Sequence, residues 1–242
     1  MVIGEIGEII RYPIKSFQGE SVQNTTIESY GLYGDRSHAF LDLTRPGKFL
    51  TATQLPEMVA YRARFTGPES TERFPDIMVT TPNEETYMWG SDALRKRLAE
   101  ASGRELSAIQ YAPHHVPIGA IEEEHLLLTT DASLAKLEEL WGERADNRRF
   151  RPNICLSLYE PIPFLEETWF GKHLIVGEAE IIVKRHCERC MIITIDPDTG
   201  DRSPSLLKTV AQQRSNYFGV YASVQRTGKI SVGDKIYLAD DM

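Results

Sequence analysis

Residues 185–200 read RHCERCMIITIDPDTG and combine sulfur with positive charge more densely than any other part of this chain. Cys187 and Cys190 are two of its three cysteines, and His186 and Arg189 lie beside them. The apolar residues after the second cysteine predict a strand, and DPDTG predicts a tight turn. The segment therefore places soft metal ligands and cations together at the start of a predicted strand.

The Cys-x-x-Cys pair has several interpretations. A thioredoxin-like redox pair opens a helix, whereas Met191–Ile195 predicts a strand, which disfavours that interpretation. A zinc half-site needs partners, and His173 and His186 have no supporting spacing. Two buried structural cysteines are a further alternative, although cationic neighbours favour the reactive thiolate, which binds metals and attacks electrophiles. The third cysteine, Cys155, lies in an apolar run and is predicted to belong to the core.

The composition limits the classes of function. The chain has 242 residues, 41 % of them hydrophobic and 26 % charged, which is typical of a globular protein with a sizeable core. The formal net charge of −8 argues against binding nucleic acid through a basic surface. Three cysteines argue against a disulfide framework. We see no membrane-spanning apolar run and no signal peptide, so we expect a cytoplasmic protein.

The residue pattern predicts a mainly β fold with a few helices, of the α+β class. Short strands and turn signals alternate through the first hundred residues, which indicates a barrel or a sandwich. Helical periodicity follows at residues 91–102, after Thr130 and after Ser203. The loop at 113–117 predicts a boundary between an N-terminal β-rich domain, residues 1–112, and a second domain, residues 113–242.

Several basic loops stand out in this acidic chain. Arg148, Arg149 and Arg151 are close together, and a guanidinium group suits a phosphate or another anion. Lys15-Ser16 after a proline and Arg36 after a glycine-aspartate turn are signals of the same kind. Each alone is weak, and a charge run is usually a solvated face. Together they indicate a polyanionic cofactor bound between the two halves of the chain.

A set of motifs taken in order resembles the MOSC family with its N-terminal β-barrel region, and within it the amidoxime-reducing proteins. The motifs are YPIKS at 12–16, GDR at 34–36, FRPN at 150–153, Arg189-Cys190 with TIDPDTG at 194–200, and FGVY at 218–221. The resemblance spans nearly the whole chain. It implies a β-barrel MOSC domain preceded by the N-terminal β-rich domain.

The resemblance also implies a molybdenum cofactor, Mo-molybdopterin, in which a phosphate-bearing pyranopterin holds the metal through its dithiolene. Cys190 would be the molybdenum ligand and the catalytic residue, with Cys187 as a supporting neighbour. The cofactor-binding residues would be Lys15, Ser16, Arg36, Arg151 and Arg189, with Asn153 and Tyr221 lining the site. Thiolate ligation suits this metal.

The function implied is two-electron reduction of small N-hydroxylated substrates, such as amidoximes and hydroxylamines. We expect electrons from a separate donor protein, which could be cytochrome b5-like, a ferredoxin or a flavin reductase. Two alternatives stay open: a non-catalytic carrier that delivers the cofactor, and a sulfur carrier that uses a Cys190 persulfide. Residues 122–125, EEEH, differ from the serine- and aspartate-containing sequence expected there, and we predict that Glu122–Glu124 form a solvated patch.

Overall fold

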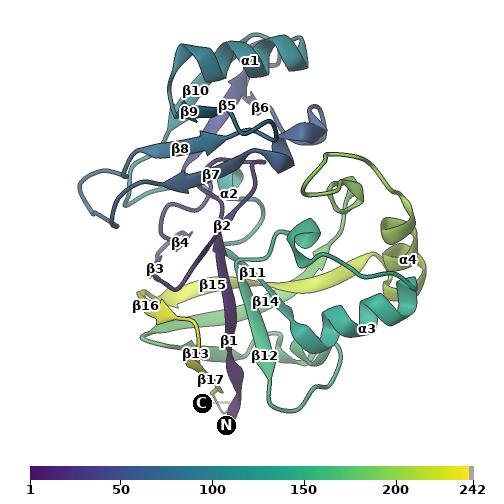
Figure 1. Cartoon of the computed structure of the whole chain (residues 1–242). Helices are drawn as coiled ribbons and strands as arrows, with labels where there is room; N and C mark the ends of the chain where they lie inside the picture. The colour runs from purple at the N-terminus through teal and green to yellow at the C-terminus, as the bar shows by residue number, and fades with distance from the viewer. Residues whose placement is uncertain (240–242) are drawn as a thin grey trace.

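The computed structural model describes residues 1–239 and has two parts, a β-barrel and a smaller β-rich unit that lies above it in Figure 1. Within those residues, seven strands close the barrel in the order β12-β11-β15-β14-β13-β17-β1. These strands are β1 (Val2–Arg11), β11 (Leu126–Thr130), β12 (Ile154–Leu158), β13 (His173–Val176), β14 (Ala179–Glu188), β15 (Tyr217–Arg226) and β17 (Lys235–Leu238). This architecture confirms the predicted mainly β fold with a few helices.

Strand β1 closes the barrel by pairing with β12 on one side and β17 on the other. Two glycines of β1 allow its close approach to β12. A Cβ atom on Gly4 would lie 2.3 Å from the carbonyl oxygen of Ser157, and a Cβ atom on Gly7 would lie 2.6 Å from the Ser157 Oγ, both too close for a side chain. Residues 2–11 are thus part of the barrel, whose other strands come from residues 126–238. The predicted boundary at residue 112 stays a prediction.

The unit above the barrel is built from two small antiparallel sheets. A third small sheet, β16-β3-β4, and the short strand β2 lie against the barrel strands. Phe17, Phe40, Tyr61 and Leu98 belong to the core of the upper unit. The strands of these sheets are β2 (Glu20–Val22), β3 (Asn24–Glu28), β4 (Gly31–Leu32), β5 (His38–Asp42), β6 (Lys48–Phe49), β7 (Arg62–Phe65), β8 (Ile77–Thr80), β9 (Thr86–Met88), β10 (Leu106–Gln110) and β16 (Gly228–Ser231).

Helices α1 and α3 begin and end where the capping residues predict, whereas α4 begins after Pro204 with no side-chain hydrogen bond at its start. The side chains of Ser91 and Thr130 accept backbone N–H groups in the first turns of α1 and α3, and both helices end at a left-handed glycine. Short 3-10 helices connect other elements. The helices are α1 (Asp92–Ser102), α2 (Ile118–Ile121), α3 (Asp131–Trp141) and α4 (Ser205–Arg214), with 3-10 helices η1 (Pro56–Ala60), η2 (Asn147–Phe150), η3 (Leu165–Trp169) and η4 (Met191–Thr194).

The predicted strand at Met191–Ile195 is wrong, because η4 occupies most of it. Ile193 packs into the apolar cluster that includes Phe150 and Phe218, while Ile195 packs with Val59 in a different cluster. A strand would project alternate side chains to two opposite faces of one sheet. A single tight turn instead lets this apolar run fill two separate cores, which a local pattern cannot reveal.

A buried carboxyl group, Glu166, makes the stability of this fold depend on pH. Its Oε2 accepts hydrogen bonds from Ser133 Oγ at 2.8 Å and Thr130 Oγ1 at 3.3 Å, and the residue is fully buried. Burial raises the pKa of Glu166, so the folded protein favours the neutral form. A glutamate in the unfolded chain ionises near pH 4.3. The stability that the neutral Glu166 side chain contributes is therefore complete below that pH, and it is lost as the pH rises through the pKa of Glu166 in the folded protein.

Glu166→Gln keeps the shape of the side chain but cannot ionise. We expect it to be more stable than the wild type by about 1 kcal/mol at pH 8 and to lose this advantage at pH 4. Urea unfolding at both pH values measures the difference. Glu160→Gln, at an exposed position, should follow the wild type. An equal stability difference at pH 4 and pH 8 would show that Glu166 is not the titrating group.

Candidate metal and cofactor site

A cavity of about 160 Å³ lies where barrel strands β11, β14 and β15 meet a loop of the upper unit. Most of the predicted site residues line it: Arg36, Arg151, Asn153, Arg189, Cys190 and Tyr221. Lys15 contacts the cavity wall through Glu122, and Ser16 follows Lys15 in a buried turn. The structure thus brings together residues from distant parts of the chain, and their predicted roles stay predictions.

The basic residues come from turns with an uncommon backbone conformation. Ser16, Arg36 and Arg151 have φ values of +69°, +49° and +56°, in the left-handed region that disfavours side chains. Such residues cost about 1 kcal/mol or more each and persist only where their surroundings hold them. Their occurrence at three predicted ligand positions is an observation independent of the motif resemblance, and it supports a binding role for these turns.

The ring of Tyr12 contacts two arginine side chains at this site. The guanidinium carbons of Arg36 and Arg151 lie 4.5 and 4.2 Å from the centre of its ring. The Tyr12 hydroxyl donates to the carbonyl of Pro152 at 3.1 Å, and its N–H donates to the carboxylate of Asp35 at 2.8 Å. Tyr12 belongs to the YPIKS motif, but its contact with both arginines could not be predicted from the sequence, because only the fold places them over one ring.

Arg151 lacks the partners that a buried guanidinium normally has. Its Nη2 is buried without a hydrogen-bond partner among residues 1–239. Burial, together with the positive charge of Arg36, lowers the pKa of Arg151 to about 10. The group stays charged at neutral pH, and a bound anion would relieve the cost of burying it.

The two cysteines lie in different environments, and Arg189 contacts one of them. Its Nη1 lies 2.7 Å from the sulfur of Cys187, and its Nη2 donates to the carbonyl of Phe150 at 2.8 Å. Cys187 is buried against Leu127 and Tyr221, whereas Cys190 is exposed at the cavity. The sulfur of Cys187 therefore already has a partner, and that of Cys190 is accessible to a metal.

The remaining predicted residues form the wall of the cavity. Asn153 is buried, its Oδ1 accepts the N–H of Leu127 at 3.0 Å, and its Nδ2 donates to the carbonyl of Ile10 at 3.4 Å. Because this amide joins β11 to β1, Asn153 shapes the cavity.

The third cysteine, Cys155, lies outside the site. Burial raises the pKa of the Cys155 thiol to about 12, and Asn147 Nδ2 donates to its sulfur at 2.8 Å.

The charges at the cavity fit a phosphate-bearing ligand. In the described part of the chain, Arg36 pairs with Asp35 and Lys15 pairs with Glu122, while Arg151 and Arg189 have no carboxylate partner. The Nε of Arg189 is also buried without a hydrogen-bond partner in that part of the chain. Two buried cations with unused donors on one cavity suit an anion that offers several acceptor oxygens. Lys15, Arg36, Arg151 and Arg189 could hold such a group, and the Cys190 sulfur could bind a metal.

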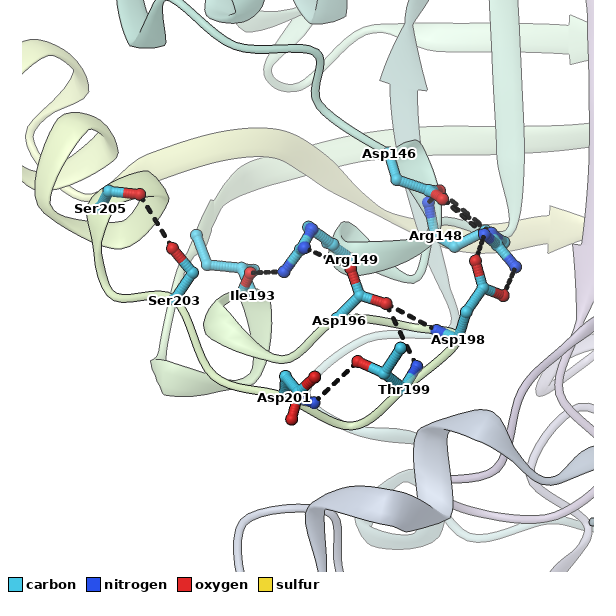
Figure 2. A network of polar contacts seen from close by, with 10 residues as sticks. All are labelled: Asp146, Arg148, Arg149, Ile193, Asp196, Asp198, Thr199, Asp201, Ser203 and Ser205. Atoms are coloured by element: carbon cyan, nitrogen blue, oxygen red, sulfur yellow. Dashed lines mark hydrogen bonds and ion pairs between the residues drawn. The ribbon is translucent and has the colours of Figure 1, made fainter. Parts of the chain in front are cut away.

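Arg148 and Arg149, which belong to the same basic run as Arg151, bind aspartates of the DPDTG turn (Figure 2). Arg148 contacts both carboxylate oxygens of Asp198 at 2.8 and 2.7 Å, and Arg149 Nη2 contacts Asp196 at 2.8 Å. These pairs join the segment before Arg151 to the loop that follows Cys190. They connect the anion side of the cavity to the thiol side.

Comparison with known proteins gives matches over the whole chain. The MOSC domain model matches residues 109–237, and the MOSC N-terminal beta barrel domain model matches residues 3–107. Mitochondrial amidoxime-reducing component 1 of Danio rerio is 28 % identical, and the match covers 97 % of this chain and 85 % of the relative. The Homo sapiens protein of the same name is 25 % identical, and the match covers 98 % of this chain and 83 % of that relative.

A solved structure shows the same fold. The crystal structure of the YUAD protein from Bacillus subtilis superposes on this chain with a TM-score of 0.54 at 13 % sequence identity. The match covers 99 % of this chain and 97 % of the YUAD chain. Within residues 1–239, no helix has the length and apolar character needed to cross a membrane.

The pair formed by Arg149 and Asp196 provides a test of how the loop after Cys190 is held. Asp196→Asn keeps an acceptor for the N–H groups of Asp198 and Thr199 but removes the charge that faces Arg149. We expect a loss of about 1 to 2 kcal/mol in the free energy of unfolding, because the guanidinium is largely buried. Urea denaturation measures it.

Asp201→Asn is the matched control, since the Asp201 carboxylate forms no ion pair within residues 1–239. Faster reaction of Cys190 with a thiol reagent should accompany the loss of stability in Asp196→Asn alone. Equal stability of the two variants would contradict the assigned function of the pair.

Proposed function

Because the chain belongs to the MOSC family, we propose that it is a molybdenum-cofactor-binding oxidoreductase that reduces N-hydroxylated compounds. The substrates would be amidoximes, hydroxylamines and similar small molecules, reduced by two electrons. The relatives named amidoxime-reducing components support this proposal. The observation that carries it is a cavity in which an exposed thiol, Cys190, faces buried guanidinium donors without partners, on Arg151 and Arg189.

When bound, the cofactor supplies the two-electron redox chemistry. The chain would supply a thiolate ligand from Cys190 and charge-assisted hydrogen bonds from Arg151 and Arg189 to the phosphate and pterin. The left-handed turns at Ser16 and Arg36 would fix the direction of the basic loop residues. Because Arg151 and Arg189 already line the cavity, binding would need little reorganisation.

Cys187 supports this site without being a second metal ligand. Its sulfur contacts the guanidinium of Arg189, which orients that group across the cavity. The aromatic ring of Phe150 lies beside the same guanidinium, at 5.4 Å from its carbon. The exposed position of Cys190 leaves room for a substrate and for a separate electron-donor protein, which we expect to be cytochrome b5-like, a ferredoxin or a flavin reductase.

Metal analysis together with pterin fluorescence tests cofactor binding. In protein produced by a host that makes the cofactor, we expect close to one molybdenum and one pterin per chain. Turnover of an amidoxime with a competent electron donor would then support the reductase. Cofactor without turnover would favour a carrier that delivers it, and a persulfide on Cys190 without molybdenum would favour sulfur transfer. Absence of both molybdenum and pterin would refute the proposal.

The two cysteines should respond differently to substitution. We expect Cys190→Ser to lose the bound molybdenum and N-reduction, because a hydroxyl is a poor substitute for a soft thiolate ligand. Cys187→Ser should retain much of both, because that sulfur is buried and contacts Arg189. Molybdenum content and amidoxime reduction, measured on both variants, provide the comparison. An equal loss in the two would disprove the assignment of Cys190 as the ligand.

A further inference from the structure

The anion-binding side of the cavity already contains a carboxylate from the chain itself, that of Glu122. This residue follows helix α2 and lies on the cavity wall. Its Oε1 lies 3.0 Å from Lys15 Nζ, which also donates to the carbonyl of Ala120 at 2.9 Å. The sequence predicts a solvated glutamate here, and the exposed side chain of Glu122 agrees with that, while the structure adds an ion pair with a buried lysine.

The carboxylate of Glu122 lies among positive charges that we also expect to bind the phosphate of the cofactor. Partial desolvation by the surrounding chain opposes its ionisation, but the positive charges of Lys15, Arg36 and Arg151 outweigh it and hold the pKa of Glu122 below its usual range. These three cations are among the residues predicted to hold the phosphate and pterin of the cofactor. The carboxylate therefore occupies part of the same positive field, and a phosphate bound there would be repelled by it.

The structure also allows Glu122 to leave this position. Its side chain is 57 % exposed, whereas that of Lys15 is only 8 % exposed. The next two residues are anchored elsewhere: Glu123 pairs with Arg185 at 2.7 Å, and Glu124 accepts from Ser223 Oγ at 2.8 Å. Rotation of one side chain into solvent would thus free Lys15, which stays oriented by its bond to Ala120.

We propose that Glu122 is an internal competitor for the anion site, which neutralises Lys15 while the site is empty and is displaced when an anionic group binds. Glu122 thereby sets the affinity of the site for its ligand. The application to the cofactor phosphate rests on the proposed function, whereas competition with a simple anion does not. The neighbouring glutamates do not share this property, because their partners lie outside the set of three cations.

Calorimetric titration with inorganic phosphate tests this proposal on the full chain, produced in a host that cannot make the cofactor. Glu122→Gln preserves the side-chain shape and removes the charge, and we expect it to bind phosphate about tenfold more tightly than the wild type. Glu123→Gln is the matched control: it removes the same charge from the same cavity wall, but its partner is Arg185 and not one of the three cations, so we expect it to bind like the wild type. Glu122→Ala gives a second variant with the same expected direction.

Unchanged or weaker phosphate affinity in both Glu122 variants would overturn the proposal. An equal gain in Glu123→Gln would also overturn it, since the effect would then be one of overall charge. Absence of phosphate binding in the wild type and in both Glu122 variants would show that no anion site exists to compete for. If the variants gain affinity but protein from a competent host holds no molybdenum or pterin, the competition stands and the proposed function fails.

Discussion

Stacking of two guanidinium groups over the ring of Tyr12 is the interaction on which the site depends. The backbone N–H of Arg36 donates to the carbonyl of Tyr12 at 2.6 Å, and the hydroxyl of Tyr12 donates to the carbonyl of Pro152. One residue thus joins the start of the chain, the loop before β5 and the segment before β12. Because like charges repel, the ring of Tyr12 and the carboxylate of Asp35 help to hold Arg36 and Arg151 together in a buried place.

The thiol side of the cavity is held by different forces. Arg148 and Arg149 fasten the turn after Cys190 by ion pairs, as Figure 2 shows, and Ile193 and Ile195 anchor it in two apolar clusters. The loop that carries Cys190 is thereby fixed relative to Arg151, which follows η2. The fold thus sets the distance between Arg151 and the thiol of Cys190. Preorganisation of this kind is what a protein contributes to the chemistry of a bound cofactor.

Much of the architecture could be predicted from local pattern. Capping residues located α1 and α3, and alternating residues with turn signals indicated a mainly β fold. The strand predicted at Met191–Ile195 failed because its apolar residues serve two cores. The pairing of β1 with β12 joins residues about 150 positions apart, as in Gly4 with Leu158, and such a pairing leaves no local signal.

The sequence by itself determined which residues can do chemistry here: cysteines beside cations, and basic loops in an acidic chain. It also determined the family, through motifs that keep their order along the chain. Only the tertiary structure decided which of these residues have partners. Arg148 and Arg149 form ion pairs with aspartates, whereas Arg151 Nη2 has no hydrogen-bond partner among residues 1–239. The reason is physical, because whether a charge is satisfied depends on burial and on partners from distant segments, and a linear sequence records neither.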